Sequence, residues 1–141
     1  MTTAPRVLFV CVRNRGKSQL AAGLMRRLVQ EHPQHPVTVV SAGTRAGTDL
    51  NTEAVQSLLE VGVDITGQHP QQLTDDLLHD ADLVVVLGSE ARVDPAGGVP
   101  VEVWETDEPS ARGIEGAERM RLVRDDVAAR VRDLHTRLAS G

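Results

Sequence analysis

The stretch that decides the fold is Arg6-Val7-Leu8-Phe9-Val10-Cys11-Val12-Arg13-Asn14-Arg15-Gly16-Lys17-Ser18. It begins with a short apolar run rich in β-branched side chains, which predicts a buried strand over residues 7–10. Residues 18–29 repeat their apolar positions at spacings of three and four, which predicts an amphipathic helix. We expect Ser18 to cap this helix. The polar residues in between therefore form a loop that joins a strand to a helix.

This loop has the features of an oxyanion-binding site around a reactive thiol. The start of a helix gathers unpaired backbone N–H groups and the positive end of the helix dipole, and three cations lie in the same loop. The same field favours the thiolate of Cys11, the only cysteine in the sequence. A small buried hydrophobic residue is the other role open to a lone cysteine, but the cation and hydroxyl that follow it favour a nucleophile. The residues expected to bind the oxyanion are Val12, Arg13, Asn14, Arg15, Gly16, Lys17 and Ser18.

The loop resembles that of the low-molecular-weight phosphotyrosine phosphatase superfamily, which reads Cys, five residues, Arg, then Ser or Thr. Asn14 stands where that family has an Asn in a left-handed backbone conformation, which Asn tolerates better than most residues. Ser41-Ala42-Gly43-Thr44 resembles the family's Ser-Ala-Gly segment, whose Ser hydrogen-bonds that Asn. The resemblance implies catalytic roles for Cys11, Lys17 and Ser18, and support of the loop by Asn14 and Ser41.

An acidic segment later in the chain is the expected source of a general acid. Trp104 and the run Thr106-Asp107-Glu108-Pro109 resemble the family's acidic loop, which ends in Asp-Pro. Here Glu108 directly precedes the proline and Asp107 lies one position earlier. Either carboxylate is suited to protonate a leaving oxygen within hydrogen-bond reach, and Asp107 is favoured because its type matches the family. A solvated acidic turn is the other interpretation of this segment.

Two departures from the phosphatases favour a small inorganic anion as substrate. Lys17 stands where phosphatases have arginine, and its point charge lacks the planar fork that holds two oxygens. The sequence has no tyrosine and one phenylalanine, so the aromatic rim that grips a phosphotyrosine ring is missing. Residues 18–21 and 106–116 resemble the arsenate reductase branch, most closely the arsenate-mycothiol transferases. A tyrosine phosphatase or phosphomonoesterase with a cysteinyl-phosphate intermediate, and a non-catalytic oxyanion-binding protein, are the alternatives.

The number of cysteines bears on the source of electrons. Thioredoxin-coupled arsenate reductases of this fold carry two further cysteines, the first just after the third strand, where this chain reads Leu87-Gly88-Ser89-Glu90. A single cysteine cannot form an internal disulfide, so reduction of arsenate would draw on an external thiol. The resemblance implies mycothiol as co-substrate and a mycoredoxin-type redoxin as the partner that later releases arsenite. No cofactor is expected to be bound permanently.

The remaining segments predict a flavodoxin-like three-layer α/β fold, with a four-stranded parallel sheet and helices on both faces. The expected strands are residues 7–10, 37–41, 83–87 and 101–104, and the further expected helices are residues 51–61, 74–80 and 117–138. We expect the last helix to pack on the sheet through one apolar stripe, which is formed by Met120, Val123, Val127, Val131, Leu134 and Leu138. A single domain is expected over residues 1–141, with residues 1–4 as a loose tail.

Composition argues against several classes of partner. The longest apolar runs are about five residues, far short of a membrane span or signal-peptide core, so a cytoplasmic protein without a membrane partner is expected. The net charge of -5 argues against nucleic acid. The five histidines lack metal-ligand spacing, so no metal is expected. Arg112 and Arg119 are candidates to face the anion or the thiol, with ion pairing to Asp125 or Asp126 as the other interpretation. These residues decide no oligomeric state.

Overall fold

The computed structural model describes residues 4–94 and 98–140. One parallel sheet has the strand order β2-β1-β3-β4. The strands are β1 (Arg6–Cys11), β2 (Thr38–Gly43), β3 (Leu83–Leu87) and β4 (Val101–Trp104). The helices are α1 (Lys17–Glu31), α2 (Thr52–Leu59), α3 (Asp75–Asp80), the 3-10 helix η1 (Pro109–Arg112) and α4 (Gly116–Ser140). Each predicted strand and helix is confirmed, with boundaries that differ by one or two residues, and η1 is an addition.

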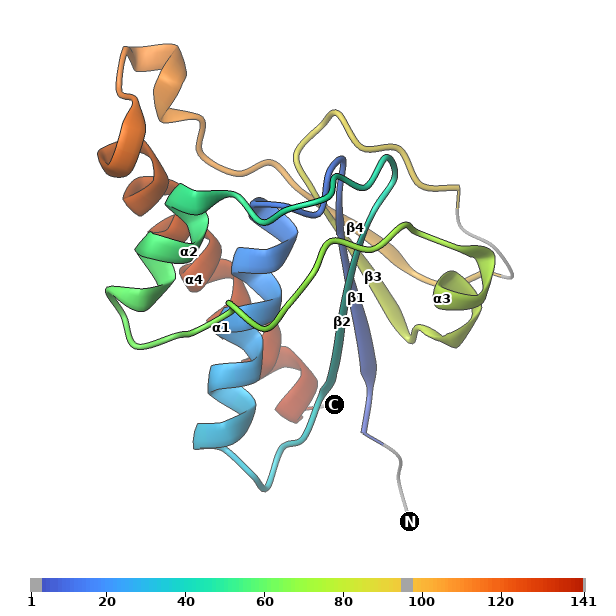
Figure 1. The fold of residues 1–141 in the computed structure, drawn as a ribbon. Helices are drawn as coiled ribbons and strands as arrows, with labels where there is room; N and C mark the ends of the chain where they lie inside the picture. Colours follow the sequence, from blue (N-terminus) through green and yellow to red (C-terminus); the bar gives the residue numbers. More distant parts are fainter. Residues whose placement is uncertain (1–3, 95–97, 141) are drawn as a thin grey trace.

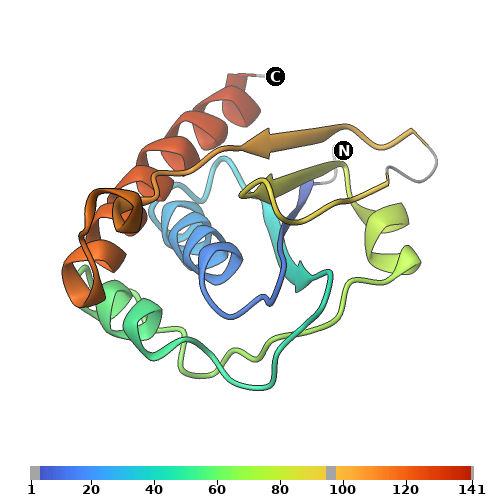
Figure 2. The ribbon, with the colours of Figure 1, turned by 90° about the horizontal axis from the view of Figure 1, so that it is seen from above.

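Helices cover both faces of the sheet, as predicted (Figures 1 and 2). Figure 2 shows α1 and α4 on one face, with α2 further along the same side, and α3 on the other face. All strand pairs are parallel, and β1 lies between β2 and β3. The carboxyl ends of the strands therefore share one edge of the sheet. In open parallel sheets this edge is where ligands bind, so the loop after β1 and the acidic segment after β4 lie at the expected place.

The larger core lies between the sheet and the helices α1 and α4. Along β1, Val7 and Phe9 face this side, and the ring of Phe9 packs 5.9 Å from that of Trp104 on β4. The predicted stripe of α4 belongs to the same core: five of its members are buried and Leu138 packs at the edge. Burial of each such side chain contributes about 1.5–3 kcal/mol. The expectation that the stripe packs toward the sheet is confirmed, and it does so side by side with α1.

The prediction that Ser18 caps its helix is wrong, whereas α2 and α3 each begin with a side-chain cap. Helix α1 begins at Lys17 with Gly16 in the N-cap position and no side-chain cap, and Ser18 is already the second helical residue. In α2, the side chain of Asn51 accepts a hydrogen bond from the Ala54 N–H at 3.0 Å. In α3, Thr74 does the same for the Leu77 N–H at 3.2 Å. The hydroxyl of Ser18 is free for a different role.

Two further points concern the N-terminal tail and the possibility of a membrane-spanning helix. The tail predicted over residues 1–4 lies outside the described residues except for Ala4. Within residues 4–94 and 98–140, no helix is both long and apolar enough to cross a membrane.

Candidate active site

Cys11 is the last residue of β1, and its buried side chain has two polar neighbours. Its Sγ lies 2.9 Å from the Ser18 Oγ and accepts a hydrogen bond from the Asn14 N–H at 3.2 Å. The Ser18 Oγ itself accepts from the Asn14 side-chain amide at 2.7 Å, so its own hydrogen is available to the sulfur. Two donors directed at one sulfur atom stabilise a thiolate. Ser18 is therefore a ligand of the sulfur instead of a helix cap.

The backbone of the loop is held by its carbonyl groups. Six consecutive carbonyl oxygens, from Cys11 to Gly16, accept hydrogen bonds from the surrounding protein. The donors are the backbone N–H groups of Thr44, Arg45, Gly47, Asn51 and Leu20 and the side-chain amide of Gln19. Among the described residues, the only partner of any N–H group from residues 12–18 is the sulfur that Asn14 binds. A row of free amides at the start of a helix is an arrangement that binds an oxyanion.

Asn14 is the hub of the loop. Its φ of 55° makes it the only residue other than glycine with a positive φ among those described, which confirms the predicted left-handed conformation. The side chain is fully buried, and its Oδ1 accepts from the Gln71 N–H at 2.9 Å and from Gln19 Nε2 at 3.3 Å. These hydrogen bonds hold Asn14 in the left-handed conformation, which residues other than glycine rarely adopt.

The expected hydrogen bond between Ser41 and Asn14 is wrong. Ser41 is buried on β2, and its carbonyl accepts from Gln71 Nε2 at 2.8 Å, while the Gln71 N–H binds Asn14. Gln71 thus stands between the two residues and links β2 to the loop. Sequence reasoning missed both Gln71 and Gln19. For Gln19 a signal existed, because it is a polar residue that precedes three apolar positions of an amphipathic helix.

Segment 43–51 encloses the loop from outside. A Cβ atom at Gly43 would lie 2.7 Å from the Val12 carbonyl oxygen and 2.9 Å from the Arg13 carbonyl carbon, which is too close for any side chain. Further along, the Arg15 Nε donates to the Asp49 carbonyl at 2.5 Å. The segment therefore fixes the loop by direct backbone contact at one end and by an arginine side chain at the other.

The three cations of the loop do not converge on one point. Arg13 and Arg15 are exposed and line an open cavity of about 500 Å³ beside segment 46–48. Lys17 is less exposed and forms an ion pair with Glu108. The binding groups that the structure brings together around Cys11 are thus the amides and the hydroxyl of Ser18. The side chain of Arg15 is committed to Asp49.

The two candidate general acids face different cations. Glu108 lies between Lys17 and the Arg119 guanidinium, which is 3.8 Å from its second oxygen. Asp107 receives two hydrogen bonds from Arg112, at 2.8 and 3.1 Å, and these hold the pKa of the Asp107 carboxyl below its usual value. Of the two carboxylates, Glu108 contacts the oxyanion loop and Asp107 is turned toward η1.

The interpretation that Arg112 and Arg119 pair with Asp125 or Asp126 is wrong. Asp125 pairs with Arg124, and Asp126 pairs with Arg130 and also accepts from the Asp107 N–H at 2.8 Å. The two arginines instead hold the acidic segment, one on each carboxylate.

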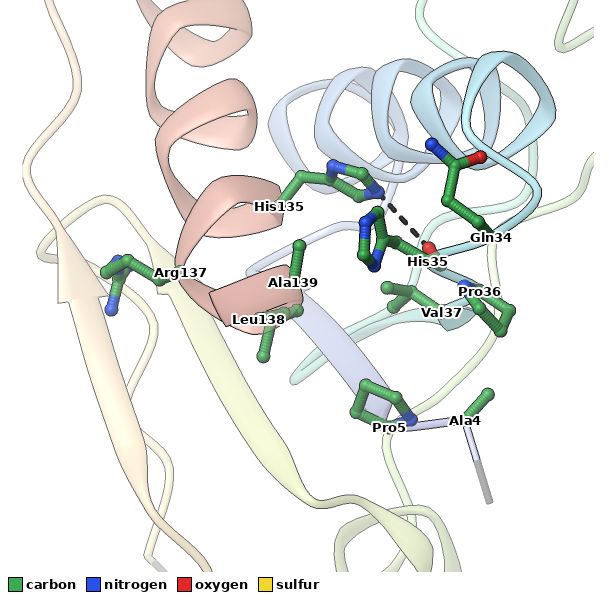
Figure 3. A pocket seen from close by; sticks show the side chains of 10 residues that line it. All are labelled: Ala4, Pro5, Gln34, His35, Pro36, Val37, His135, Arg137, Leu138 and Ala139. Carbon is green, nitrogen blue, oxygen red and sulfur yellow. Dashed lines mark hydrogen bonds between the residues drawn. The ribbon is translucent and has the colours of Figure 1, made fainter. Parts of the chain in front are cut away.

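A cavity comparable in size to the one beside Arg13 and Arg15 lies away from Cys11. It has a volume of about 520 Å³ and opens beside the residues that precede β1 and β2, at the opposite edge of the sheet (Figure 3). Inside it, the buried His135 donates from Nε2 to the His35 carbonyl at 3.2 Å. Across the described part of the chain, no group of three His, Cys, Asp or Glu side chains is arranged to hold a metal ion. Size alone therefore does not mark the reactive site.

A parallel α/β sheet with a cysteine and an anion-binding loop after its first strand defines a class of cysteine-dependent oxyanion enzymes. Within this class, residues 6–95 match the family model described as low molecular weight phosphotyrosine protein phosphatase. The chain belongs to this family. The acidic segment lies beyond the matched range, and its interpretation depends on whole-chain relatives.

Those relatives are arsenate reductases. The chain is 33% identical over 135 residues to the arsenate reductase of Bacillus licheniformis. The match covers 89% of this chain and 91% of that protein. A solved arsenate reductase in the phosphate binding state superposes with a TM-score of 0.80 at 28% identity, over 95% of this chain and 98% of that one. The thioredoxin-dependent arsenate reductase of Corynebacterium glutamicum superposes with a TM-score of 0.79 at 28% identity, over 97% of this chain. This chain spans only 63% of the Corynebacterium protein. The chain lies in the arsenate reductase branch of the family.

Proposed function

We propose that this protein is an arsenate reductase that joins arsenate to an external low-molecular-weight thiol, mycothiol. The observation that carries the proposal is the loop after β1: the carbonyl groups of residues 11–16 all accept hydrogen bonds, while among the described residues the N–H groups of residues 12–18 have no partner except the Cys11 sulfur. Such a cradle fits a tetrahedral oxyanion, and the relatives in its branch are named for the reduction of arsenate.

In the proposed reaction, the loop amides hold the oxygens of arsenate beside Cys11, and Ser18 orients the sulfur. The sulfur of the thiol forms a bond to arsenic while one As–O bond breaks, and that oxygen leaves as water after it takes up a proton. Arsenic stays in the +5 state at this step. A redoxin thiolate then attacks the mycothiol sulfur, the electron pair of the S–As bond passes to arsenic, and arsenite leaves together with a mixed disulfide.

The proton for the leaving oxygen is assigned to the acidic segment. Glu108 is the better placed donor because it contacts the loop through Lys17, whereas Asp107 is turned toward Arg112 of η1. A general acid must lie within hydrogen-bond reach of the leaving oxygen. This arrangement shifts our preference from Asp107 to Glu108.

The choice of thiol rests on two arguments. One is that a single cysteine cannot pass its oxidation to an internal disulfide. The other is the similarity of residues 18–21 and 106–116 to arsenate-mycothiol transferases. The Corynebacterium relative is described as thioredoxin-dependent, so thioredoxin is the donor against which mycothiol must be tested.

The test is arsenite production from arsenate by the purified protein in three parallel reactions. One contains mycothiol with a mycothiol-specific redoxin and its reductase, one contains thioredoxin with its reductase, and one offers an aryl phosphate without thiol. We expect arsenite only with mycothiol, and none from Cys11→Ser. Arsenite with thioredoxin alone would overturn the thiol assignment. Aryl phosphate hydrolysis without arsenite, further increased in Lys17→Arg, would move the protein to the phosphatases.

A further inference from the structure

Arg26, on the outer side of α1, is a cation that lacks a partner. Its guanidinium makes no hydrogen bond or ion pair within residues 4–94 and 98–140, and its Nη1 is completely covered. Burial lowers the pKa of Arg26, because the charged form has lost part of its solvation. Arg26 is half-buried, and its covered Nη1 has lost water without gaining a hydrogen-bond partner, which costs folding free energy. The structure therefore holds an unfavourable charge at a defined place.

The neighbouring arginine shows what a satisfied guanidinium looks like in the same surroundings. Arg27 donates from Nη1 to the Gly62 carbonyl at 2.8 Å, and its Nε lies 3.7 Å from the Glu31 carboxylate. Arg27 thus fastens α1 to the turn after α2. Arg26 makes no comparable hydrogen bond or ion pair with any described residue.

Arg26 lines a groove between α1 and the chain segment that follows Gly62. Figure 1 shows this segment passing in front of α1 on its way to α3. The groove has a volume of about 260 Å³, and its lining includes Gln30 from α1 and Gln68 from the segment, both of which carry amide side chains. Amide and guanidinium N–H groups together offer donors suited to the oxygens of an anion.

Asp64, the only carboxylate in the lining, already accepts hydrogen bonds from Thr66. Asp64 accepts from the Thr66 N–H at 2.8 Å and from the Thr66 hydroxyl at 2.6 Å, and these bonds lower the pKa of Asp64. No oxygen of Asp64 lies within ion-pair distance of Arg26. Arg27 is paired with Glu31 and Asp64 is bound by Thr66, so Arg26 is the charged group of the groove that has no partner among the described residues.

We propose that this groove is a second anion-binding site, for a small molecule that carries a phosphate-like oxyanion or a carboxylate, with Arg26 as its main ligand. Because Nη1 is covered, the edge of the guanidinium formed by Nε and Nη2 is the one that offers two donors to the oxygens of such a group. The rise of an α-helix places Arg26 roughly 13 Å along α1 from Lys17, so this site is separate from the loop around Cys11. A bound anion would also neutralise the covered charge.

The first test is an NMR titration of the ¹⁵N-labelled protein with sodium phosphate, against sodium chloride at equal ionic strength. We expect two independent sets of shifts, one in residues 12–18 and one in residues 62–68 with the Arg26 Nε–H. In Arg26→Leu the second set should need about 10- to 100-fold more phosphate while the first is unchanged. The control Arg132→Leu removes an exposed arginine of α4 outside the groove and should titrate as the wild type does.

Shifts confined to residues 12–18, or a groove that responds equally in Arg26→Leu, would overturn the proposal. Neither readout uses turnover, so this result is independent of the test for arsenate reduction.

A second test uses thermal unfolding. Without phosphate, Arg26→Leu should unfold at the same temperature as the wild type or a higher one, because the variant lacks an unpaired covered charge. Phosphate should raise the unfolding temperature of the wild type by more than that of the variant. If Arg26→Leu lowers the unfolding temperature in chloride, Arg26 has a stabilising partner in solution and the groove is not an anion site.

Discussion

Gly43 at the end of β2 packs directly on the backbone of Val12, so closely that a Cβ atom would lie 2.7 Å from the Val12 carbonyl oxygen. The same Cβ would meet the Arg13 carbonyl carbon at 2.9 Å. Both neighbours are backbone atoms of the oxyanion loop, which cannot yield as a side-chain end can. The position of the loop amides therefore depends on the absence of a side chain at residue 43.

We predict that Gly43→Ala lowers kcat/KM for arsenate by about 100-fold, because a shift of roughly 1 Å in binding groups has an effect of that order. The measurement is steady-state arsenite production together with circular dichroism to show that the fold is kept. Gly67→Ala is the matched control, because a Cβ at Gly67 would meet no atom within 4 Å. Equal activity in both variants would show that the loop does not need the close contact.

A pair of substitutions at Asn14 separates its backbone role from its side-chain role. Asn14→Gly keeps the positive φ of 55° without strain but removes the hydrogen bonds to Ser18 and Gln71, whereas Asn14→Ala loses both the conformation and the bonds. We expect the Ala variant to be less stable than the Gly variant by about 1 kcal/mol, the cost of the left-handed conformation. Urea unfolding measures the difference. Equal stability of the two variants would mean that the backbone of residue 14 is not strained.

Activity should fall in both Asn14 variants, since the bond from Asn14 to Ser18 is lost in each. A loss of one hydrogen bond to a group that orients the nucleophile costs about 1–3 kcal/mol, or roughly 10- to 100-fold in kcat. Full activity in Asn14→Gly would show that the hydrogen bonds of the Asn14 side chain to Gln71 and Ser18 do not contribute to catalysis.

Whether a feature of the fold or the site could be predicted depends on how far apart in the sequence its interacting residues lie. The strands and helices follow from local apolar patterns, as in residues 7–10, and the loop follows from the spacing between Cys11 and Ser18. Two of the contacts that the sequence did not reveal join residues far apart in the chain: Gln71 is 57 residues from Asn14, and Glu108 is 91 residues from Lys17. Such pairs depend on how the elements meet in space, which no local pattern records.

The error at Arg112 has a local cause instead. Nearby aspartates on α4 are natural partners by sequence distance, but η1 turns the Arg112 side chain back to Asp107, five residues earlier. The 3-10 turn that causes this is four residues long, too short to leave a periodic signal.

Glu108 and Asp107 lead to different expected effects of mutation if one or the other is the general acid. If Glu108 protonates the leaving oxygen, Glu108→Gln should lower kcat by about 100-fold, within the range for general acid catalysis, and Asp107→Asn should have a much smaller effect. Single-turnover rates of arsenite formation measure the step. Arg119→Leu is a useful companion, because it removes the second cation from Glu108 and leaves Lys17 in place. A larger loss in Asp107→Asn would restore Asp107 as the acid.

Asp107 itself should titrate in a way that depends on Arg112. In the wild type the pKa of Asp107 is lowered, first by the hydrogen bonds from Arg112, so the group stays ionised until the pH falls well into the acid range. Arg112→Leu removes these donors, and we expect the pKa of Asp107 to rise toward the usual value for Asp. ¹³C NMR of the carboxyl group measures both titrations. An unchanged pKa in the variant would show that the pair is not formed in solution.

The last prediction concerns acid stability and the junction between α2 and α4. Glu60 at the end of α2 accepts hydrogen bonds from Arg121 and Arg124 of α4, and the first of these is the main reason that its pKa is lowered to about 2 from an ordinary 4.5. Because the folded pKa lies below the unfolded one, the pairing contributes its full stabilisation above about pH 4.5. That contribution is lost as the pH falls from there toward 2. Glu60→Gln should therefore unfold at lower urea concentration than the wild type at pH 7, and the gap should narrow as the pH falls below about 4.5 toward 2.

Glu53→Gln on the same helix is the control, and it should show no such pH-dependent gap. Glu53 forms no ion pair with any residue that the structure describes, so the change removes one negative charge from α2 without breaking a bond between the helices. A gap for Glu60→Gln that stays constant from pH 7 to pH 3 would assign its effect to packing at the helix junction and not to the charge of Glu60.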